Sequence, residues 1–459
     1  MVFSSNCFIF RFLLLFMVVY LLTPKKYRNG VLLLGSLLFY GIGEPHFIWI
    51  LMGSVAINYV LSLRIVRKKS RVALITTLVF DFLILFLFKY WDFGAENINR
   101  LVQQEFLPLL HLALPLGISF YTFQMASFQI DCYKGKIEQG FSFVDFATYI
   151  CMFPQLVAGP IVKYQEIAPE LKNRECTIKN VEQGFQLFTV GLGLKVLLAN
   201  PMGTLWNAIQ TAGTVGLSGR VAWLGAFAYS FQIYFDFWGY SVMAAGLGKM
   251  IGFRIPANFQ NPYISKSMSE FWRRWHITLG RWFKEYVYIP LGGNRRGNKR
   301  TIFNLFVVWT LTGLWHGASW NFVLWGFSFF LLLAIEKIFL GSILEKHSLL
   351  GHLYVILVIP VTWVVFGITD FKILVQYLSS MFGMNGSNVL VGQEQFIRYL
   401  GTYGALLGFC VLFSTPIPMR IYKRFSEHFF MKIILVVVLG FSVYEMLQGS
   451  NNPFLYFRF

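Results

Sequence analysis

The chain has 459 residues, of which 56% are hydrophobic and 13% are charged, and its mean hydropathy is +0.58. A soluble globular domain carries about 25% charged residues, so this composition excludes a water-soluble protein and predicts a chain solvated by lipid. The formal net charge of +18 lies in short basic runs between apolar stretches, such as 25–28 and 295–300, which is typical of cytoplasmic loops and does not indicate a nucleic-acid partner.

The N-terminal stretch predicts a retained first membrane span at 8–22. Arg11 interrupts its apolar run, lysines follow the run rather than precede it, and no small-residue cleavage site is present, which argues against a signal peptide. The five cysteines are scattered without a CxxC pair, so they indicate neither a disulfide framework nor a metal site.

Further apolar stretches follow along the chain. A span needs roughly 20 apolar residues, and on that basis we predict about 12 spans in an all-α, polytopic membrane protein. Residues 1–459 are expected to form a single transmembrane domain, with 145–160 and 371–383 as re-entrant or interfacial segments. The predicted spans are 8–22, 30–42, 47–63, 72–90, 107–128, 183–200, 219–243, 302–317, 319–339, 351–368, 397–414 and 431–447.

The basic residues predict the orientation of the spans. If the N-terminus lies outside the cytoplasm, the loops at 25–28, 64–71, 161–180 and 250–300 lie inside, and all of them carry Lys or Arg. An even number of spans returns the C-terminus to the outside. We therefore expect both termini to be extracytoplasmic.

The segment 261–300 interrupts the apolar pattern and is predicted to be a cytoplasmic amphipathic and basic segment. Ser267 or Ser269 is expected to cap a helix that starts near Glu270. An interfacial helix lying in the headgroups is one interpretation, and a cationic floor that attracts an anionic acyl donor is the other. His276 favours the second interpretation, because an imidazole has no anchoring role there. The expected aromatic stripe consists of Phe271, Trp275, Leu279 and Trp282.

The apolar segment 302–317 ends in Trp315-His316-Gly317, which contains the strongest catalytic candidate. An ionisable side chain at membrane depth is costly and is a functional candidate by default. Gly313 and Gly317 are four residues apart, so the backbone can be approached closely on that face. The alternative is a core histidine that a single carbonyl satisfies.

Other polar residues give weaker indications. No metal site is predicted, because no third ligand accompanies His276 and His316 at a suggestive spacing. Asp81 and Asp236 lie within apolar spans. A proton relay is one interpretation of each, and pairing with an Arg, Tyr or Trp donor is the preferred one.

Several motifs resemble the membrane-bound O-acyltransferases over nearly the whole chain. The most specific are FWRRWH at 271–276, YIPLGGNR at 288–295 and LWHG at 314–317. Earlier stretches agree, namely PLGISFYTFQ at 115–124, FPQLVAGP at 153–160 and YFDFWGY at 234–240. Within the family, the YIPLGGNR run is similar to the branch of alginate and peptidoglycan O-acetyltransferases.

This resemblance implies a bowl of helices in which a cytoplasmic and an outer funnel meet at His316. It implies transfer of an acyl group, expected to be acetyl, from a cytoplasmic thioester (acetyl-CoA or an acyl carrier) across a bacterial cytoplasmic membrane. The implied acceptor is a cell-envelope polysaccharide, either peptidoglycan or an alginate-like exopolysaccharide. The implied partner is an extracytoplasmic transferase with an SGNH or esterase-like fold, and no bound cofactor is expected.

Two other functions remain open at this point. One is D-alanyl transfer to teichoic acid, which a related branch performs. The other is a polytopic transporter whose histidine relays protons. Transporters often carry internal repeats and broken helix pairs, and the sequence has neither.

Roles for individual residues follow from the chemistry of acyl transfer. His316 is the expected general base for the incoming hydroxyl, and His276 is expected to donate to the oxyanion or to position the thioester. Arginine is suited to bidentate phosphate contacts. The residues expected to bind the donor are Arg273, Arg281, Trp315, Asn294 and Arg295.

The segment 431–459 combines the last predicted span with the aromatic run FLYFRF at 454–459. The run resembles a C-terminal motif in which the tyrosine is proposed to carry the acyl group, which implies that role for Tyr456. An aromatic anchor at the membrane interface is the alternative.

Overall fold

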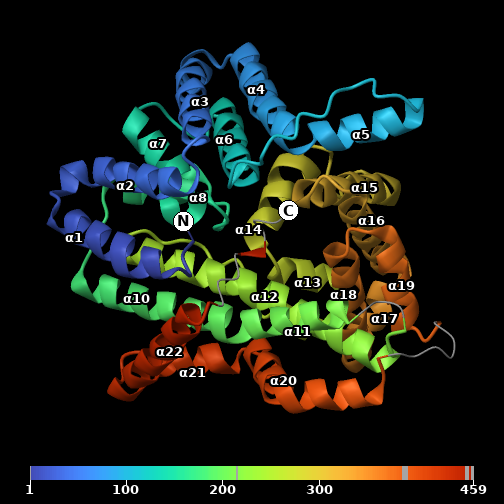
Figure 1. Cartoon of the computed structure of the whole chain (residues 1–459). Coiled ribbons are helices and arrows are strands. Elements are labelled where there is room, and N and C mark those ends of the chain that lie inside the picture. Colours follow the sequence, from blue (N-terminus) through green and yellow to red (C-terminus); the bar gives the residue numbers. More distant parts are fainter. Residues whose placement is uncertain (1, 213–215, 385–390, 450–453, 456–459) are drawn as a thin grey trace. The chain divides into compact units, whose positions relative to one another are not determined.

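The computed structural model describes residues 2–212, 216–384, 391–449 and 454–455, and the regular elements in these ranges are helical (Figure 1). The predicted all-α fold is confirmed, since these ranges contain no strand and one isolated bridge, between Leu217 and Val391. The chain divides into two compact units, which are Met1–Phe188 with Tyr240–Pro256 and Thr189–Gly239 with Ala257–Phe459. A single domain over 1–459 remains a prediction.

The first unit contains the N-terminal helices, the start of α10 and the end of α12. Ser142 and Asp145 begin α7 with a capping box, and the Ser70 hydroxyl begins α4 by accepting the backbone N–H of Ala73. Its elements are η1 (Phe8–Leu13), α1 (Leu14–Leu22), η2 (Lys25–Tyr27), α2 (Arg28–Gly43), α3 (Ile48–Lys68), α4 (Arg71–Lys89), α5 (Trp91–Val102), α6 (Ile118–Tyr133), α7 (Phe143–Cys151), α8 (Phe153–Leu156) and α9 (Tyr164–Lys172), with parts of α10 (Ile178–Gly193) and α12 (Gly219–Met250).

A buried polar cluster joins α3, α4 and α6, which lie side by side in the first unit (Figure 1). The Asn58 amide donates to the Asp81 carboxylate at 2.7 Å, and the Gln129 amide donates to the Asn58 side-chain oxygen at 2.9 Å. The predicted Arg, Tyr or Trp donor for Asp81 is therefore wrong. An amide on α3 faces this carboxylate, and spacing along α4 carries no information about the neighbouring helix.

The second unit contains the end of α10, the start of α12 and the C-terminal half of the chain. In this unit α15 and α16 form an antiparallel pair joined by a short turn (Figure 1). Its elements are η3 (Leu194–Ala199), α11 (Asn200–Thr211), η4 (Pro262–Ile264), α13 (Met268–Arg274), α14 (Ile277–Phe283), η5 (Lys284–Tyr288), α15 (Gly297–His316), α16 (Trp320–Ile335), η6 (Glu336–Leu340), α17 (Gly341–Lys346), α18 (Ser348–Gly367), α19 (Phe371–Met381), α20 (Gln393–Ser414), α21 (Ile417–Phe425) and α22 (Phe429–Leu447).

Small residues allow the close approach of α15 and α16. A Cβ on Gly313 would lie 2.4 Å from the carbonyl oxygen of Phe322, and a Cβ on Gly326 would lie 2.4 Å from the carbonyl oxygen of Trp309. The two backbones therefore touch at these glycines. This confirms the expected close approach at Gly313, on the helix that ends at His316.

Seven helical stretches among the described residues are long and apolar enough to cross a membrane. The predicted count of about 12 spans is not confirmed. The predicted span at 107–128 has helix only from Ile118, and those at 8–22 and 30–42 are shorter than a membrane span. The predicted spans at 219–243 and 302–317, the second of which ends near His316, are helical but are not among the seven stretches. Several of the seven stretches expose large apolar side chains, as α22 does with Phe429, Phe430 and Val436, which is the expected arrangement for helices that face lipid. The seven are Ile48–Lys68, Arg71–Lys89, Ile178–Thr211, Trp320–Lys346, Ser348–Gly367, Gln393–Ser414 and Phe429–Leu447.

The helix predicted to start near Glu270 is present as α13 but breaks after seven residues, which make about two turns. Ser267 caps α13 as predicted, because its hydroxyl accepts the backbone N–H of Glu270 at 3.0 Å. Trp275 then adopts an extended conformation and His276 a left-handed one before α14 begins. The expected stripe is buried in the protein, since Phe271, Trp275, Leu279 and Trp282 are each less than 7% exposed.

Candidate active site around His316

His316 is the last residue of α15, and its imidazole is enclosed by aromatic rings. The helix ends here because Gly317 is fully extended. The side chain is 4% exposed, and its ring centroid lies 5.0 Å from that of Trp315, 4.9 Å from that of Trp325 and 5.3 Å from that of Phe366. All three rings meet the imidazole edge to face, which is a favourable arrangement for aromatic pairs.

Packing of α15, α16 and α18 fixes this enclosure. Asn321, in the first turn of α16, donates its amide to the carbonyl of Phe366 at 2.9 Å and so ties α16 to the end of α18. The glycine contact between α15 and α16 sets the distance between His316 and Trp325. The position of His316 is therefore determined by helix packing rather than by a flexible loop.

His276 occupies the break between α13 and α14 with φ of 44°. Its Nδ1 lies 3.2 Å from Oδ1 of Asn258, which also accepts the backbone N–H of Thr278 at 3.1 Å. A backbone N–H only donates, so this Asn258 atom is an acceptor and the His276 Nδ1 must carry the proton. In this tautomer the Nε2 of a neutral His276 is an acceptor.

The charge state of His276 follows from its surroundings. The side chain is 1% exposed and lies outside the seven candidate spans. Burial lowers the pKa of His276 to about 3, because the imidazolium would lose its hydration. The imidazole is therefore neutral near neutral pH, with the Nδ1 proton directed at Asn258.

Trp315 lies between the two predicted catalytic histidines. Its ring centroid is 5.8 Å from that of His276 and 5.0 Å from that of His316, and the residue is 4% exposed. The structure thus brings His276, Trp315 and His316 together in the second unit. Spacing along the chain gave no indication that the two histidines share a neighbour.

A buried glutamate anchors the helix that leads to His276. Glu336, which follows α16, accepts the backbone N–H of Met268, the backbone N–H of Ser269 at 3.0 Å and the hydroxyl of Ser269 at 2.7 Å. An acidic side chain at a helix N-terminus satisfies otherwise unpaired N–H groups. Glu336 therefore connects the α15–α16 pair to α13.

The YIPLGGNR run forms a tight turn that is held against α15. Gly292 and Gly293 have φ of 108° and 57°, a region that residues with a Cβ adopt rarely, so this turn requires glycine. Asn304 on α15 donates its amide to the carbonyl of Gly293 at 2.8 Å, and Arg300 donates to the carbonyl of Leu291 at 3.0 Å. The turn presents Asn294 and Arg295 as exposed side chains.

The five residues expected to bind the donor fall into two groups. Arg273, Asn294 and Arg295 are exposed and Arg281 is half-buried, so these four side chains can reach a ligand. Trp315 is buried between the histidines and forms a wall of the site. That the arginines share one phosphate site remains a prediction.

Sequence reasoning did not identify Trp325 as part of the site. Its indole is fully buried beside His316, and its Nε1 has no hydrogen-bond partner within the described ranges. A buried donor without a partner is costly and calls for an explanation. Trp325 follows His316 by nine residues across a turn, and such a spacing does not reveal the contact.

Asp236 pairs with Lys195 on η3, and both side chains are buried in the second unit. The predicted Arg, Tyr or Trp donor is wrong here as well, because a lysine of a neighbouring helix supplies the charge. Tyr456 lies outside the described residues. Its neighbours Phe454 and Leu455 are described, and both are buried.

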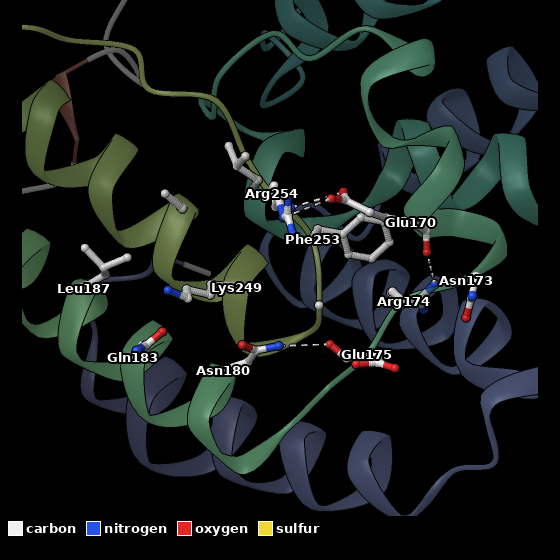
Figure 2. Close-up of a pocket in the computed structure, with 13 residues that line it drawn as sticks. Glu170, Asn173, Arg174, Glu175, Asn180, Gln183, Leu187, Lys249, Phe253 and Arg254 are labelled. Carbon is white, nitrogen blue, oxygen red and sulfur yellow. Dashed lines mark hydrogen bonds and ion pairs between the residues drawn. The ribbon is translucent and has the colours of Figure 1, made fainter. Parts of the chain in front are cut away.

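The first unit contains a separate polar cavity of about 620 Å³ (Figure 2). Arg174 forms part of its wall, where it donates to the Tyr20 hydroxyl at 2.8 Å and to the Asn29 oxygen at 2.6 Å and lies over the ring of Phe253. Arg254 donates its backbone N–H to the Glu170 carboxylate at 3.1 Å. None of the five predicted donor-binding residues lines this cavity. Its lining residues are Glu170, Asn173, Arg174, Glu175, Asn180, Gln183, Leu187, Ala245, Lys249, Gly252, Phe253, Arg254 and Ile255.

Comparison with known proteins agrees with the motifs. The model of the membrane-bound O-acyltransferase family matches residues 55–380. The chain is 38% identical to a probable alginate O-acetylase AlgI of Pseudomonas putida over the full length of both proteins. It is 40% identical to the Pseudomonas aeruginosa protein of that name over 83% of this chain and 75% of the relative. It is 30% identical to a peptidoglycan O-acetyltransferase of Helicobacter pylori over 100% of this chain and 98% of the relative. The chain therefore belongs to the membrane-bound O-acyltransferase family, as a multi-pass membrane O-acyltransferase.

Proposed function

We propose that the protein transfers an acetyl group from a cytoplasmic thioester to a hydroxyl, with His316 as the general base. The acetyl group is then delivered to a cell-envelope polysaccharide. The observation that carries this proposal is the buried imidazole at the end of α15, which three aromatic rings enclose. Similarity to O-acetylases of alginate and of peptidoglycan over the full chain supports acetyl as the acyl group and a polysaccharide as the final acceptor.

The chemistry requires one proton to move twice. His316 takes the proton of the attacking hydroxyl as its oxygen bonds to the thioester carbonyl carbon. The tetrahedral intermediate then expels the thiolate by breaking the C–S bond, and the imidazolium returns the proton to the leaving sulfur. General acid–base catalysis of this kind contributes roughly 10²–10⁴-fold to the rate.

The oxyanion of the intermediate needs a donor. The tautomer of His276 makes its Nε2 an acceptor, so the positioning role fits this residue better than donation to an oxyanion. The Nε1–H of Trp325 is the donor that we assign to the oxyanion, because it is buried beside His316.

The exposed basic residues support proposals for the acyl donor and for the orientation of the protein in the membrane. Arg273 and Arg295 are exposed on the segment that carries His276, which supports a role for them in binding the phosphates of acetyl-CoA or of an acyl carrier. Basic loops face the cytoplasm in membrane proteins, which supports a bacterial cytoplasmic membrane with both termini outside. An extracytoplasmic SGNH or esterase-like transferase is the proposed partner that places the acetyl group on the polymer.

The last step inside this chain is assigned to Tyr456. Its phenol would be the attacking hydroxyl: the phenol oxygen takes the acetyl group as an ester while His316 moves the phenol proton to the leaving sulfur. The group would then pass to the partner transferase. Phe454 and Leu455, the described residues that precede Tyr456, are buried in the same unit as His316, which supports this assignment.

The test compares His316→Ala with His347→Ala, a control at an exposed histidine. We expect His316→Ala to abolish polymer O-acetylation in cells at matched membrane levels, while His347→Ala leaves it unchanged. Transfer from radiolabelled acetyl-CoA in detergent, with D-alanyl thioester in parallel, identifies the acyl group. Near-normal acetylation by His316→Ala would refute the catalytic role, and transport without thioester turnover would favour a transporter.

A further inference from the structure

Two charged side chains meet inside the second unit. Lys195 is 3% exposed and Asp236 is 1% exposed, and they form an ion pair. Removing two charges from water costs more than a buried ion pair usually returns, so such a pair is weak evidence of a stabilising role. Charged groups inside a membrane bundle are instead candidates for function.

The backbones around this pair are in contact, which fixes its geometry. Lys195 lies on η3, a π-helical turn, and such turns are frequent at functional sites. A Cβ on Gly239 of α12 would lie 2.7 Å from the carbonyl oxygen of Gly191 and 3.0 Å from the backbone nitrogen of Lys195. The close contact holds the ammonium and the carboxylate opposite each other.

The second carboxylate oxygen of Asp236 binds the end of the chain. It accepts the backbone N–H of Leu455 at 2.7 Å, from a residue 219 positions away in sequence. The neighbouring Phe454 is 1% exposed, and its ring centroid lies 5.6 Å from that of Phe237. The Phe237 ring lies 4.6 Å from the ring of His276, so one aromatic residue links the tail to the predicted site.

We propose that Lys195 and Asp236 are positioning residues that hold the C-terminal segment in place for acyl transfer. This inference rests on the proposed role of Tyr456, the residue that follows Leu455. Lys195 orients the carboxylate by binding one oxygen, and the other oxygen then receives the backbone of the tail. A charged acceptor forms a shorter and stronger hydrogen bond than a neutral one, which favours Asp236 as the anchor of Leu455.

Variants of Lys195, Asp236 and Leu455 distinguish loss of the anchor of the C-terminal segment from loss of folding. Asp236→Asn alone leaves the Lys195 charge buried without its partner and is expected to destabilise the protein. The double variant Lys195→Met with Asp236→Leu removes both charges together, so it should fold with a similar melting temperature. Leu455→Pro deletes the N–H donor alone, and Leu455→Ala is its control, because alanine keeps the N–H.

The first measurement is the position at which trimming by carboxypeptidase Y, which also removes proline, stops in the purified full-length protein, read by intact mass. Trimming should stop at Leu455 in the unaltered protein and in Leu455→Ala. It should continue past Phe454 in the double variant and in Leu455→Pro. Identical end points in all four proteins would overturn the proposal, whatever their activities.

The second measurement separates the two half-reactions. Transfer to the polymer in membranes should fall about 10²-fold in the double variant, which is the scale of a 1 Å misplacement. Hydrolysis of the donor thioester, in which water takes the acetyl group in place of the tail, should persist. A role confined to folding would instead lower both rates and the melting temperature together. If the double variant is trimmed past Phe454 and still transfers acetyl to the polymer at the normal rate, the positioning role is overturned. Normal transfer by Tyr456→Phe, with trimming that still stops at the same residue, refutes the relay and leaves the anchor intact.

Discussion

His316 shares its enclosure with Trp325, and the two side chains offer complementary groups. The imidazole can accept a proton, whereas the indole N–H can only donate. Both are buried on neighbouring helices, with ring centroids 4.9 Å apart. This arrangement allows one to act on the attacking hydroxyl and the other on the carbonyl oxygen of the same acyl group.

Replacement of Trp325 by Phe tests the assigned donor, because Phe keeps an aromatic ring and deletes the N–H. We expect kcat to fall about 10²–10³-fold, as for loss of one oxyanion donor, with KM for the thioester little changed. The measurement is steady-state transfer from labelled acetyl-CoA in detergent. The control is Trp309→Phe, a buried tryptophan that packs on Trp272 and Phe329. Equal losses in the two variants would assign the effect of Trp325 to packing.

At the residue scale, the sequence indicated which residues are candidates for the site better than it indicated their conformations. His316 was predicted from an ionisable group at the end of an apolar helix; the structure confirms that it ends a helix and shows that it is buried, and its catalytic role stays a prediction. The left-handed conformation of His276 was not predictable, because a residue with a Cβ adopts it only where tertiary contacts impose it. The hydrogen bonds to Asn258 supply those contacts here, from a residue 18 positions earlier.

At the scale of elements, the glycine contact between α15 and α16 positions the site. We expect Gly326→Ala to lower the melting temperature and to reduce acyl transfer, because its Cβ would meet the carbonyl oxygen of Trp309 at 2.4 Å and the Cα of Gly313 at 3.1 Å. Backbone atoms cannot rotate away, so overpacking of this kind costs about 1–3 kcal/mol.

Gly401→Ala on α20 is the matched control for this substitution. A Cβ there meets nothing within 4 Å, so alanine should be neutral or slightly stabilising through its higher helix propensity. Thermal unfolding in detergent and transfer activity are measured on both variants. A melting temperature of Gly326→Ala that matches the Gly401→Ala value would contradict the packing argument.

Long apolar helices were predicted well, and short or interrupted ones were not. The predicted spans at 47–63, 72–90 and 431–447 correspond to α3, α4 and α22 within a few residues. The helix expected beyond Glu270 breaks at Trp275, although its hydrophobic spacing continues through Leu279 and Trp282. Hydrophobic spacing indicates which residues are buried. The apolar residues on both sides of the break are buried, so the spacing continues through the break and does not reveal it.

At the scale of the whole molecule, acyl transfer is proposed to join the middle of the chain to its end. Tyr456→Phe keeps an aromatic side chain and removes the phenol. We expect this variant to lose polymer acetylation and to cleave the donor thioester only by hydrolysis, with water in place of the phenol. The measurement is ester-linked acetate on isolated polymer, with Tyr444→Phe on the exposed face of α22 as the control. Full acetylation by Tyr456→Phe would leave the interfacial anchor as the better interpretation of the motif.

Family membership was predictable because its motifs are local runs with specific residues. The structure explains two of these runs physically: the YIPLGGNR turn requires glycine at positive φ, and the LWHG run ends a helix at the imidazole. The association of Asp236 with Leu455 was not predictable, because it depends on how distant segments fold together.

The amide of Asn258 has a consequence for variation at this site. Its side-chain oxygen accepts the hydrogen bond from the Nδ1–H of His276. An aspartate at this position would present a negatively charged carboxylate oxygen instead. Asparagine and aspartate codons differ by a single nucleotide. A carboxylate there would favour the imidazolium and raise the pKa of His276, so one mutation would place two opposite charges beside the site. Asparagine at position 258 therefore helps to keep the His276 imidazole uncharged.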